Sequence, residues 1–327
     1  MSDSLERENL ETWLRRPSIF IANAWYLLAA AGLFALNWLS VLLGSLFPGI
    51  ERLLSAMISP IYNLCLLAFP VAMYASTRPG VTQALRLKRP RWYECAEALA
   101  LALPAVMLCD CLGSWWYLLL EAIGGHLTPP QTVYAAGWPG WFSLFLSQAF
   151  LPGICEELLL HGGVLGAWER RGTLHGLCVS SALFCALHGS IQGLPVQLFM
   201  GFALGVLIIR SDSLIPGMIC HIAFNAISLL LSAKSGAQAV AYADFAGWIA
   251  QNGGLSLLLF RTLVSAFVFG ALLMMYMSHR RAGQPFDKVR PGEREVMEWD
   301  ELFLLLAALL TVAVRYGADL LSVGGLR

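Results

Sequence analysis

The chain has 327 residues, of which 58% are hydrophobic and only 13% are charged, and its formal net charge is zero. Soluble domains carry about 25% charged residues, about twice the fraction found here. Together with a mean hydropathy of +0.66, this excludes an ordinary soluble protein and indicates a polytopic membrane protein. The balanced charge gives no support to nucleic-acid binding, and we expect no nucleic-acid partner.

Hydropathy predicts an all-α transmembrane helical bundle with about 8–9 spans, because each crossing needs about 20 apolar residues. The expected spans, in chain order, are residues 18–47, 51–76, 94–120, 139–167, 174–191, 195–210, 214–232 and 255–277. A ninth segment at 299–317 is weaker, since its apolar core from Leu302 to Val314 is short for a crossing. It is expected either to span or to lie at the membrane interface.

These spans predict a single integral membrane domain over residues 1–327. Within it we expect N-terminal spans in 1–93, a catalytic core in 139–232, and a basic loop followed by the weak span in 278–327. The first 16 residues are polar and mixed in charge, and the apolar run after them is too long for a signal peptide. A first membrane helix is therefore expected there.

Lysine and arginine predict the orientation. Alternate connections are basic, and they contain Arg78, Arg86, Lys88, Arg89 and Arg91, then Arg170 and Arg171, then Arg280, Arg281, Lys288, Arg290 and Arg294. The loops between them, 121–138 and 233–254, hold one lysine. We therefore expect a cytoplasmic N-terminus in a multi-pass protein, with a prokaryotic plasma membrane as the default location.

Three apolar runs carry polar side chains that a bilayer disfavours. Glu156 and Glu157 are adjacent in one run, His188 ends the sequence FCALH in the next, and HIAFN runs from His221 to Asn225. An ionised side chain at the bilayer centre costs about 3 kcal/mol even on the mildest scale. Such a set indicates a buried polar site.

Helical spacing suggests how these groups face one another. Residues four apart share a helix face, so Glu157 is expected to face with His161, and His221 with Asn225. Glu156 points about 100° away from Glu157 and is free to serve another partner. A bundle that brought Glu156, His188, His221 and Asn225 together would suit hydrolysis.

The chemistry of that set is specific. A carboxylate and an imidazole can hold and deprotonate a water molecule between them. A second imidazole and an amide can donate hydrogen bonds to the oxyanion of a tetrahedral intermediate. The Pro152-Gly153 step just before the glutamates is expected to loosen the helix and admit water or substrate.

The order of the motifs, E-E followed by F-x-x-x-H and then H-x-x-x-N, resembles that of the CPBP or ABI family of intramembrane endopeptidases. This family includes the type II CAAX prenyl endopeptidases, and the resemblance covers about residues 139–232. It implies that Glu156 and His188 activate water, and that His221 and Asn225 stabilise the oxyanion. It also implies a peptide hydrolase that acts without a metal on lipidated or membrane-anchored proteins or peptides.

One position departs from the family pattern, which commonly has arginine four residues after the second glutamate. Here the residue is His161. Arginine would pair permanently with Glu157, whereas histidine is not always charged. We expect His161 to pair with Glu157 and support the two-glutamate turn, in a divergent subgroup with its own substrates.

Several alternatives remain open from the sequence. Glu156, His188 and His221 offer a three-ligand zinc site. Our first expectation, however, is a site without a metal or other cofactor. The same buried acids would suit an ion or proton transporter, or the fold could serve as a catalytically silent scaffold or immunity-type protein. Asp110, a further intramembrane acid, is expected to bond a neighbouring helix rather than join the site.

Overall fold

The computed structural model describes residues 17–47, 49–77, 80–125, 137–235, 245–278 and 298–323. Within these ranges the chain is helical and contains no strand. The all-α fold expected from the composition is therefore confirmed.

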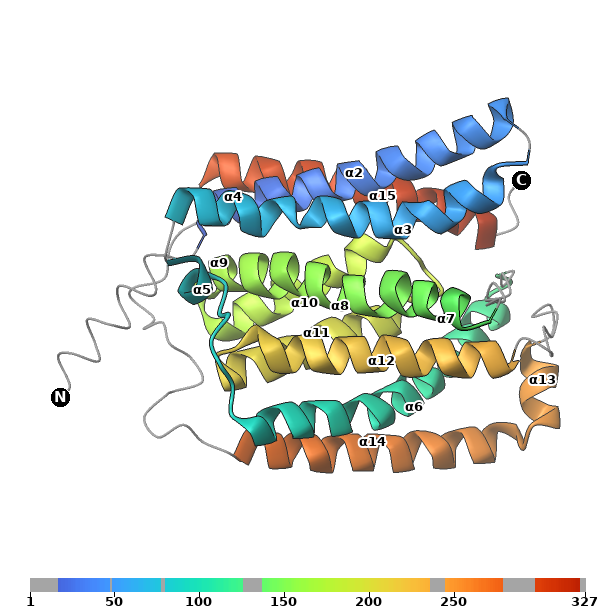
Figure 1. Ribbon diagram of the computed structural model, residues 1–327. Coiled ribbons are helices and arrows are strands. Elements are labelled where there is room, and N and C mark those ends of the chain that lie inside the picture. Colours follow the sequence, from blue (N-terminus) through green and yellow to red (C-terminus); the bar gives the residue numbers. More distant parts are fainter. Residues whose placement is uncertain are drawn as a thin grey trace.

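The helices form three groups (Figure 1). One outer group consists of α2 (Ile19–Leu46), α3 (Glu51–Leu66), α4 (Ala68–Thr77) and α15 (Trp299–Val323). The opposite outer group consists of α6 (Trp92–Ala122) and α14 (Gly254–Ser278), with the short α13 (Phe245–Gln251) at one end. The central group consists of a long helical run over 137–171, α10 (Thr173–His188), α11 (Leu194–Ser211) and α12 (Leu214–Ser235).

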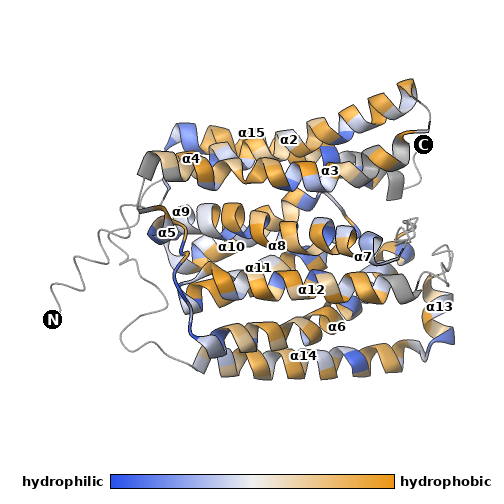
Figure 2. Ribbon diagram, viewed as in Figure 1, coloured by the Kyte–Doolittle hydropathy of each residue, from blue (hydrophilic) through white to orange (hydrophobic). Residues whose placement is uncertain are grey.

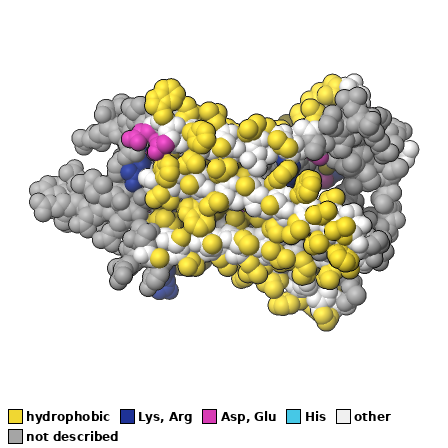
Figure 3. Space-filling model, turned by 90° about the horizontal axis from the view of Figure 1, so that it is seen from above, with side chains coloured by type: hydrophobic (Ala, Val, Ile, Leu, Met, Phe, Trp, Pro, Cys, Tyr) yellow, Lys and Arg dark blue, Asp and Glu magenta, His cyan; other side chains and the backbone are white. Residues whose placement is uncertain are grey.

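Six helices of the described chain are long and apolar enough to cross a membrane, and two shorter apolar helical stretches, Met57–Met73 and Thr173–His188, accompany them. Hydrophobic residues extend along most of every long helix (Figure 2). In the face seen in Figure 3, hydrophobic side chains fill the middle, and most of the described charged side chains lie towards the ends. The polytopic membrane architecture is confirmed.

The expected span 51–76 is broken rather than continuous. Helix α3 ends at Leu66 and α4 begins at Ala68, so a turn at Leu67 separates them. Pro70 explains the break, because it has no N–H to donate to the carbonyl of Leu66, four residues earlier. Hydropathy could not predict this break, since both halves are apolar.

The weak segment at 299–317 is in fact the 25-residue helix α15, which reaches Val323. Its length, about 38 Å at 1.5 Å per residue, is enough to cross the hydrocarbon core. It packs along α2, where the side-chain amide of Asn23 donates a 2.9 Å hydrogen bond to the Glu301 carbonyl. The helix is therefore an integral part of the bundle.

The central run over 137–171 contains two wide π-helical turns. It consists of α7 (Gly137–Phe145), η2 (Leu146–Phe150), α8 (Leu151–Glu156), η3 (Glu157–Val164), α9 (Leu165–Trp168) and η4 (Glu169–Arg171). The Pro152-Gly153 step, expected to open the helix, is instead buried within α8. A Cβ on Gly153 would lie 2.5 Å from Cγ1 of Ile222, so this glycine permits close approach of α8 and α12.

Buried ion pairs tie together the end of the molecule where the described basic connections meet. Arg86 forms a salt bridge with Glu169, and its Nε lies 3.3 Å from Oδ1 of Asp212. Lys88 Nζ lies 2.7 Å from the other oxygen of Asp212. Gathering at one end agrees with the expected topology. The assignment of that end to the cytoplasm stays a prediction.

Asp110 is bonded to a neighbouring helix and not to a motif residue. Its Oδ2 accepts a 2.6 Å hydrogen bond from Nη2 of Arg261, which joins α6 to α14. Both side chains are exposed on the surface of the bundle. The geometry agrees with the expected structural role.

Candidate active site

The second glutamate of the pair, Glu157, bridges two histidines from different parts of the chain. Its Oε2 lies 2.8 Å from Nδ1 of His161, one turn along the same helix. Its Oε1 lies 2.9 Å from Nδ1 of His221 on α12, 64 residues away. The carboxylate is completely buried, so both contacts act in a low-dielectric interior where they are strong.

His161 occupies the expected position beside Glu157 and makes a second contact. Its Nε2 lies 3.0 Å from the carbonyl oxygen of Gly201 on α11. A carbonyl can only accept, so Nε2 carries a proton. The Nδ1 contact with Glu157 is short but poorly aligned for a hydrogen bond, and it is favoured electrostatically when that nitrogen also carries a proton.

The phenylalanine of the F-x-x-x-H motif lies among three histidines. The Phe184 ring centroid is 4.9 Å from that of His188, 5.7 Å from that of His221 and 6.0 Å from that of His161. Phe184 is itself buried against Gly201, where an added Cβ would lie 3.0 Å from its own Cβ. The three motifs are thus held together by one aromatic ring.

Hydrogen bonds also fix which nitrogen each motif histidine presents. Nδ1 of His188 lies 2.9 Å from the Phe184 carbonyl, and Nδ1 of His221 lies 2.9 Å from the Glu157 carboxylate. Each acceptor requires a proton on Nδ1. In the neutral form of either ring, Nε2 is therefore an unprotonated acceptor, available as a base or, once protonated, as a cationic donor.

Glu156, the residue directly before Glu157 in the helix, is half-buried. Its Oε2 is enclosed in protein and has no hydrogen-bond partner among the described residues. The carboxylate lies near His221 and near Tyr62 of α3. An enclosed carboxylate oxygen without a partner is costly in a structural residue, so Glu156 is a better candidate for chemistry than for packing.

Asn225 lies one turn after His221 on α12 and is half-buried. Because residues four apart share a helix face, its amide and the His221 imidazole face the same side. The structure thus brings Glu157, His161, His188 and His221 into direct contact or around one ring. Glu156 lies near His221, and Asn225 lies one turn after His221 on the same face of α12.

An apolar groove of about 390 Å³ runs between α2 and α3 beside this cluster. Its walls are almost entirely hydrocarbon, and they are formed by Trp25, Leu28, Ala29, Gly32, Ala35, Leu36, Leu39, Tyr62, Cys65, Leu66, Phe69 and Leu159. Tyr62 contributes a buried hydroxyl that has no partner in the described part of the chain. Tyr62 lines the groove and also lies near Glu156.

The zinc alternative requires Glu156, His188 and His221 to converge. Over the residues that the structure describes, no three or more His, Cys, Asp or Glu side chains are arranged to hold a metal ion. Nδ1 of each histidine is already bonded to protein. The expectation of a metal-independent site remains a prediction.

Reasoning from the sequence missed several residues around the site. The Glu157–His221 pair joins separate helices, so spacing along one helix gave no signal for it. Gly201 belongs to none of the motifs, yet its carbonyl binds His161. Tyr62 and the α15 residues near His188 lay outside every motif. For α15, only the charged Arg315 and Asp319 within an apolar segment offered a signal.

Comparison with known proteins gives one match. Residues 138–227 match the family described as type II CAAX prenyl endopeptidase Rce1-like. No curated protein and no solved structure matches the chain. The matched segment contains all three motifs, and it confirms the family resemblance inferred from them. Residues 138–227 of this membrane protein are therefore similar to the Rce1-like domain of the type II CAAX prenyl endopeptidases.

Proposed function

We propose that the protein is an intramembrane endopeptidase. It would cleave a peptide bond in a C-terminal or membrane-embedded segment of a lipidated or membrane-anchored protein, using activated water. The observation that carries the proposal is the Glu157–His221 pair at 2.9 Å, packed with His188 around Phe184. Peptide hydrolysis needs a base and an oxyanion donor held in fixed orientation, and this arrangement supplies oriented groups for both.

The proposed roles follow from the bonding of each group. Glu156, whose Oε2 has no partner among the described residues, would take the proton from water together with Nε2 of His188. His221 and Asn225 would stabilise the oxyanion. Because Nδ1–H of His221 is held by Glu157, its Nε2 donates only as an imidazolium, and the buried carboxylate favours that charge.

The groove between α2 and α3 supports a lipidated substrate. Its lining is almost wholly apolar and ends near Tyr62 and Glu156, which suits a hydrocarbon chain attached close to the scissile bond. A protein partner that is anchored in the bilayer reaches the groove laterally. An ion transporter would have no use for a groove lined with hydrocarbon, and a silent scaffold would need no unpartnered Glu156, so we do not favour those alternatives.

The test uses the purified full chain in lipid nanodiscs and an internally quenched peptide with an S-farnesylcysteine before three apolar residues. Glu156→Gln should lower kcat at least about 100-fold, because general-base catalysis contributes about 10²- to 10⁴-fold. Asp110→Asn is the matched control, since it removes an exposed intramembrane acid that is paired with Arg261 and not with a motif residue. Its turnover should stay near that of wild type.

Three results would reject the proposal. They are hydrolysis that is unaffected by Glu156→Gln, hydrolysis lost equally in Asp110→Asn, or proton flux through wild-type liposomes without peptide cleavage. If the proposal passes these tests, crosslinking of the Glu156→Gln protein in native membranes would identify the natural substrate. The trapped protein should be one that accumulates uncut in cells that carry the variant.

A further inference from the structure

The last helix, α15, binds the chain segment on both sides of the proposed catalytic histidine. The hydroxyl of Tyr316 donates a 3.0 Å bond to the Cys185 carbonyl, and Nη1 of Arg315 donates a 3.1 Å bond to the Leu187 carbonyl. Asp319 accepts a 2.5 Å bond from the backbone N–H of Ile191. These carbonyls belong to the last turn of α10, where helix acceptors lack internal partners.

Gly189, directly after His188, makes room for the arginine. It has a φ of +57°, in the left-handed region, and an added Cβ would lie 2.4 Å from Cδ of Arg315. Any other residue would displace the arginine side chain or strain the backbone. The Arg315 stem therefore lies directly across the end of the helix that carries His188.

The charge of Arg315 is not matched by a close carboxylate. Within the described residues, no carboxylate oxygen lies within 4.0 Å of its guanidinium, and Asp319 interacts with it only at longer range. A guanidinium has five N–H donors, and the Leu187 carbonyl takes one of them. The side chain is half-buried, and none of its nitrogens is an enclosed atom without a partner. Donors therefore remain accessible.

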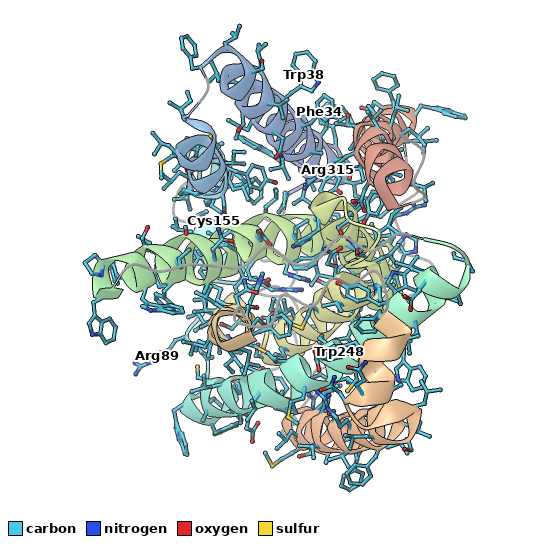
Figure 4. The ribbon with its side chains drawn as sticks, turned by 90° about the vertical axis from the view of Figure 1, so that its right-hand side faces the viewer. Phe34, Trp38, Arg89, Cys155, Trp248 and Arg315 are labelled. Atoms are coloured by element: carbon cyan, nitrogen blue, oxygen red, sulfur yellow. The ribbon has the colours of Figure 1, made fainter. Side chains whose placement is uncertain are left out.

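Arg315 also belongs to the electrostatic neighbourhood of the site. It lies near Tyr62, and Tyr62 lies near Glu156. In Figure 4 it lies on the inner side of α15, towards α2 and the helical run that carries Cys155. A cation within a membrane bundle costs about 3 kcal/mol on the mildest scale. An accessible cation in this place points to an anion in the ligand.

We propose that Arg315 binds the C-terminal carboxylate of the peptide substrate. The inference rests on the proposed peptidase function. A free carboxylate is the one anion that every peptide cut near its end carries. The planar fork of a guanidinium matches a carboxylate with two parallel bonds.

Binding can be measured without hydrolysis in the full-length Glu156→Gln protein in nanodiscs. The probe is a fluorescent farnesylated peptide prepared with either a C-terminal carboxylate or a C-terminal amide. We expect the acid to bind about 10- to 100-fold more tightly than the amide, as for a hydrogen bond to a charged group. Adding Arg315→Gln should abolish that preference by weakening only the acid. Arg315→Lys should retain part of it.

Arg261→Gln is the matched control, because it removes an arginine from a membrane helix on the far side of the bundle. It should leave the acid-to-amide ratio unchanged. Equal affinity of the parent protein for acid and amide would overturn the inference without need of any folded variant. So would an equal loss of both peptides in Arg315→Gln, which indicates a structural clamp. An effect seen only in nanodiscs with anionic lipid, which indicates a lipid phosphate, would overturn it as well.

The two proposals fail separately. If the protein discriminates acid from amide but wild type never hydrolyses either peptide, the carboxylate site stands and the peptidase function falls. If wild type hydrolyses both equally well and Arg315→Gln changes neither rate, the peptidase stands and the role of Arg315 falls.

Discussion

Replacing Glu157 with glutamine removes the buried charge between two histidines while keeping the shape of the side chain. The glutamine oxygen can accept from Nδ1–H of His221, and its amide can donate to Nδ1 of a neutral His161. The fold should therefore lose no more than about 1 kcal/mol. Glu157→Ala, in contrast, removes the partner of Nδ1 on two buried imidazoles and should cost about 3–5 kcal/mol.

The catalytic loss should be much larger than the loss of stability in Glu157→Gln. An imidazolium on His221 gains about 4 kcal/mol from a carboxylate about 4 Å away at an effective dielectric of about 20. Removal of one oxyanion-hole donor costs about 2.7–4 kcal/mol. Both magnitudes predict that kcat falls about 10²- to 10³-fold, with little change in KM, because the charge matters most in the transition state.

The assay is turnover of the quenched farnesylated peptide together with thermal unfolding of the same preparation. Glu169→Gln is the matched control, since it neutralises another buried glutamate of the same helical run, one paired with Arg86 away from the site. It should lower the unfolding temperature but leave kcat of the folded protein intact. Wild-type kcat in Glu157→Gln, or unfolding as severe as in Glu157→Ala, would refute this account of the pair.

His161→Ala should lower stability by about 1–3 kcal/mol and turnover with it, because the Gly201 carbonyl and Glu157 both lose a buried partner. His161→Arg should keep both properties between pH 6 and 8, and an alanine variant with wild-type melting and turnover would show that the imidazole only fills space. Asn225→Ala should reduce kcat about 10²- to 10³-fold without shifting the unfolding temperature; an unchanged rate would remove it from the oxyanion site. Gly153→Ala places a Cβ 3.0 Å from a backbone nitrogen on α12, so it should cost about 1–3 kcal/mol, and unaltered thermal unfolding would contradict the close packing.

The sequence predicted those features that depend on one helix at a time. Apolar length located the spans, and i,i+4 spacing predicted the contact of Glu157 with His161. It could not predict the contact of Glu157 with His221, because that depends on how α12 is rotated about its own axis. The π-helical turn over Glu157–Val164 changes the phase of the helix at the site, and no residue type marks such a turn.

The C-terminal helix shows a second limit. Hydropathy predicts that the apolar core of this segment ends at Val314, because Arg315 and Asp319 follow. These two residues bind the end of α10 and the residues directly after it. A charged residue lowers a hydropathy average whether it faces lipid or a protein partner. Only the three-dimensional arrangement separates the two cases. The sharing of one site by Glu156, His188, His221 and Asn225 stays a prediction for the assays above.

The pairing of α2 with α15 has a consequence for biogenesis. α2 is made early and α15 last among the described helices. The Asn23 side chain of α2 is satisfied by the Trp168 indole N–H at 3.0 Å and by the Glu301 carbonyl. Until α15 leaves the ribosome, the NH₂ group of Asn23 lacks the Glu301 carbonyl as its acceptor. The seam between α2 and α15 should therefore close late in insertion, and the bundle should reach its full stability only when its final helix docks.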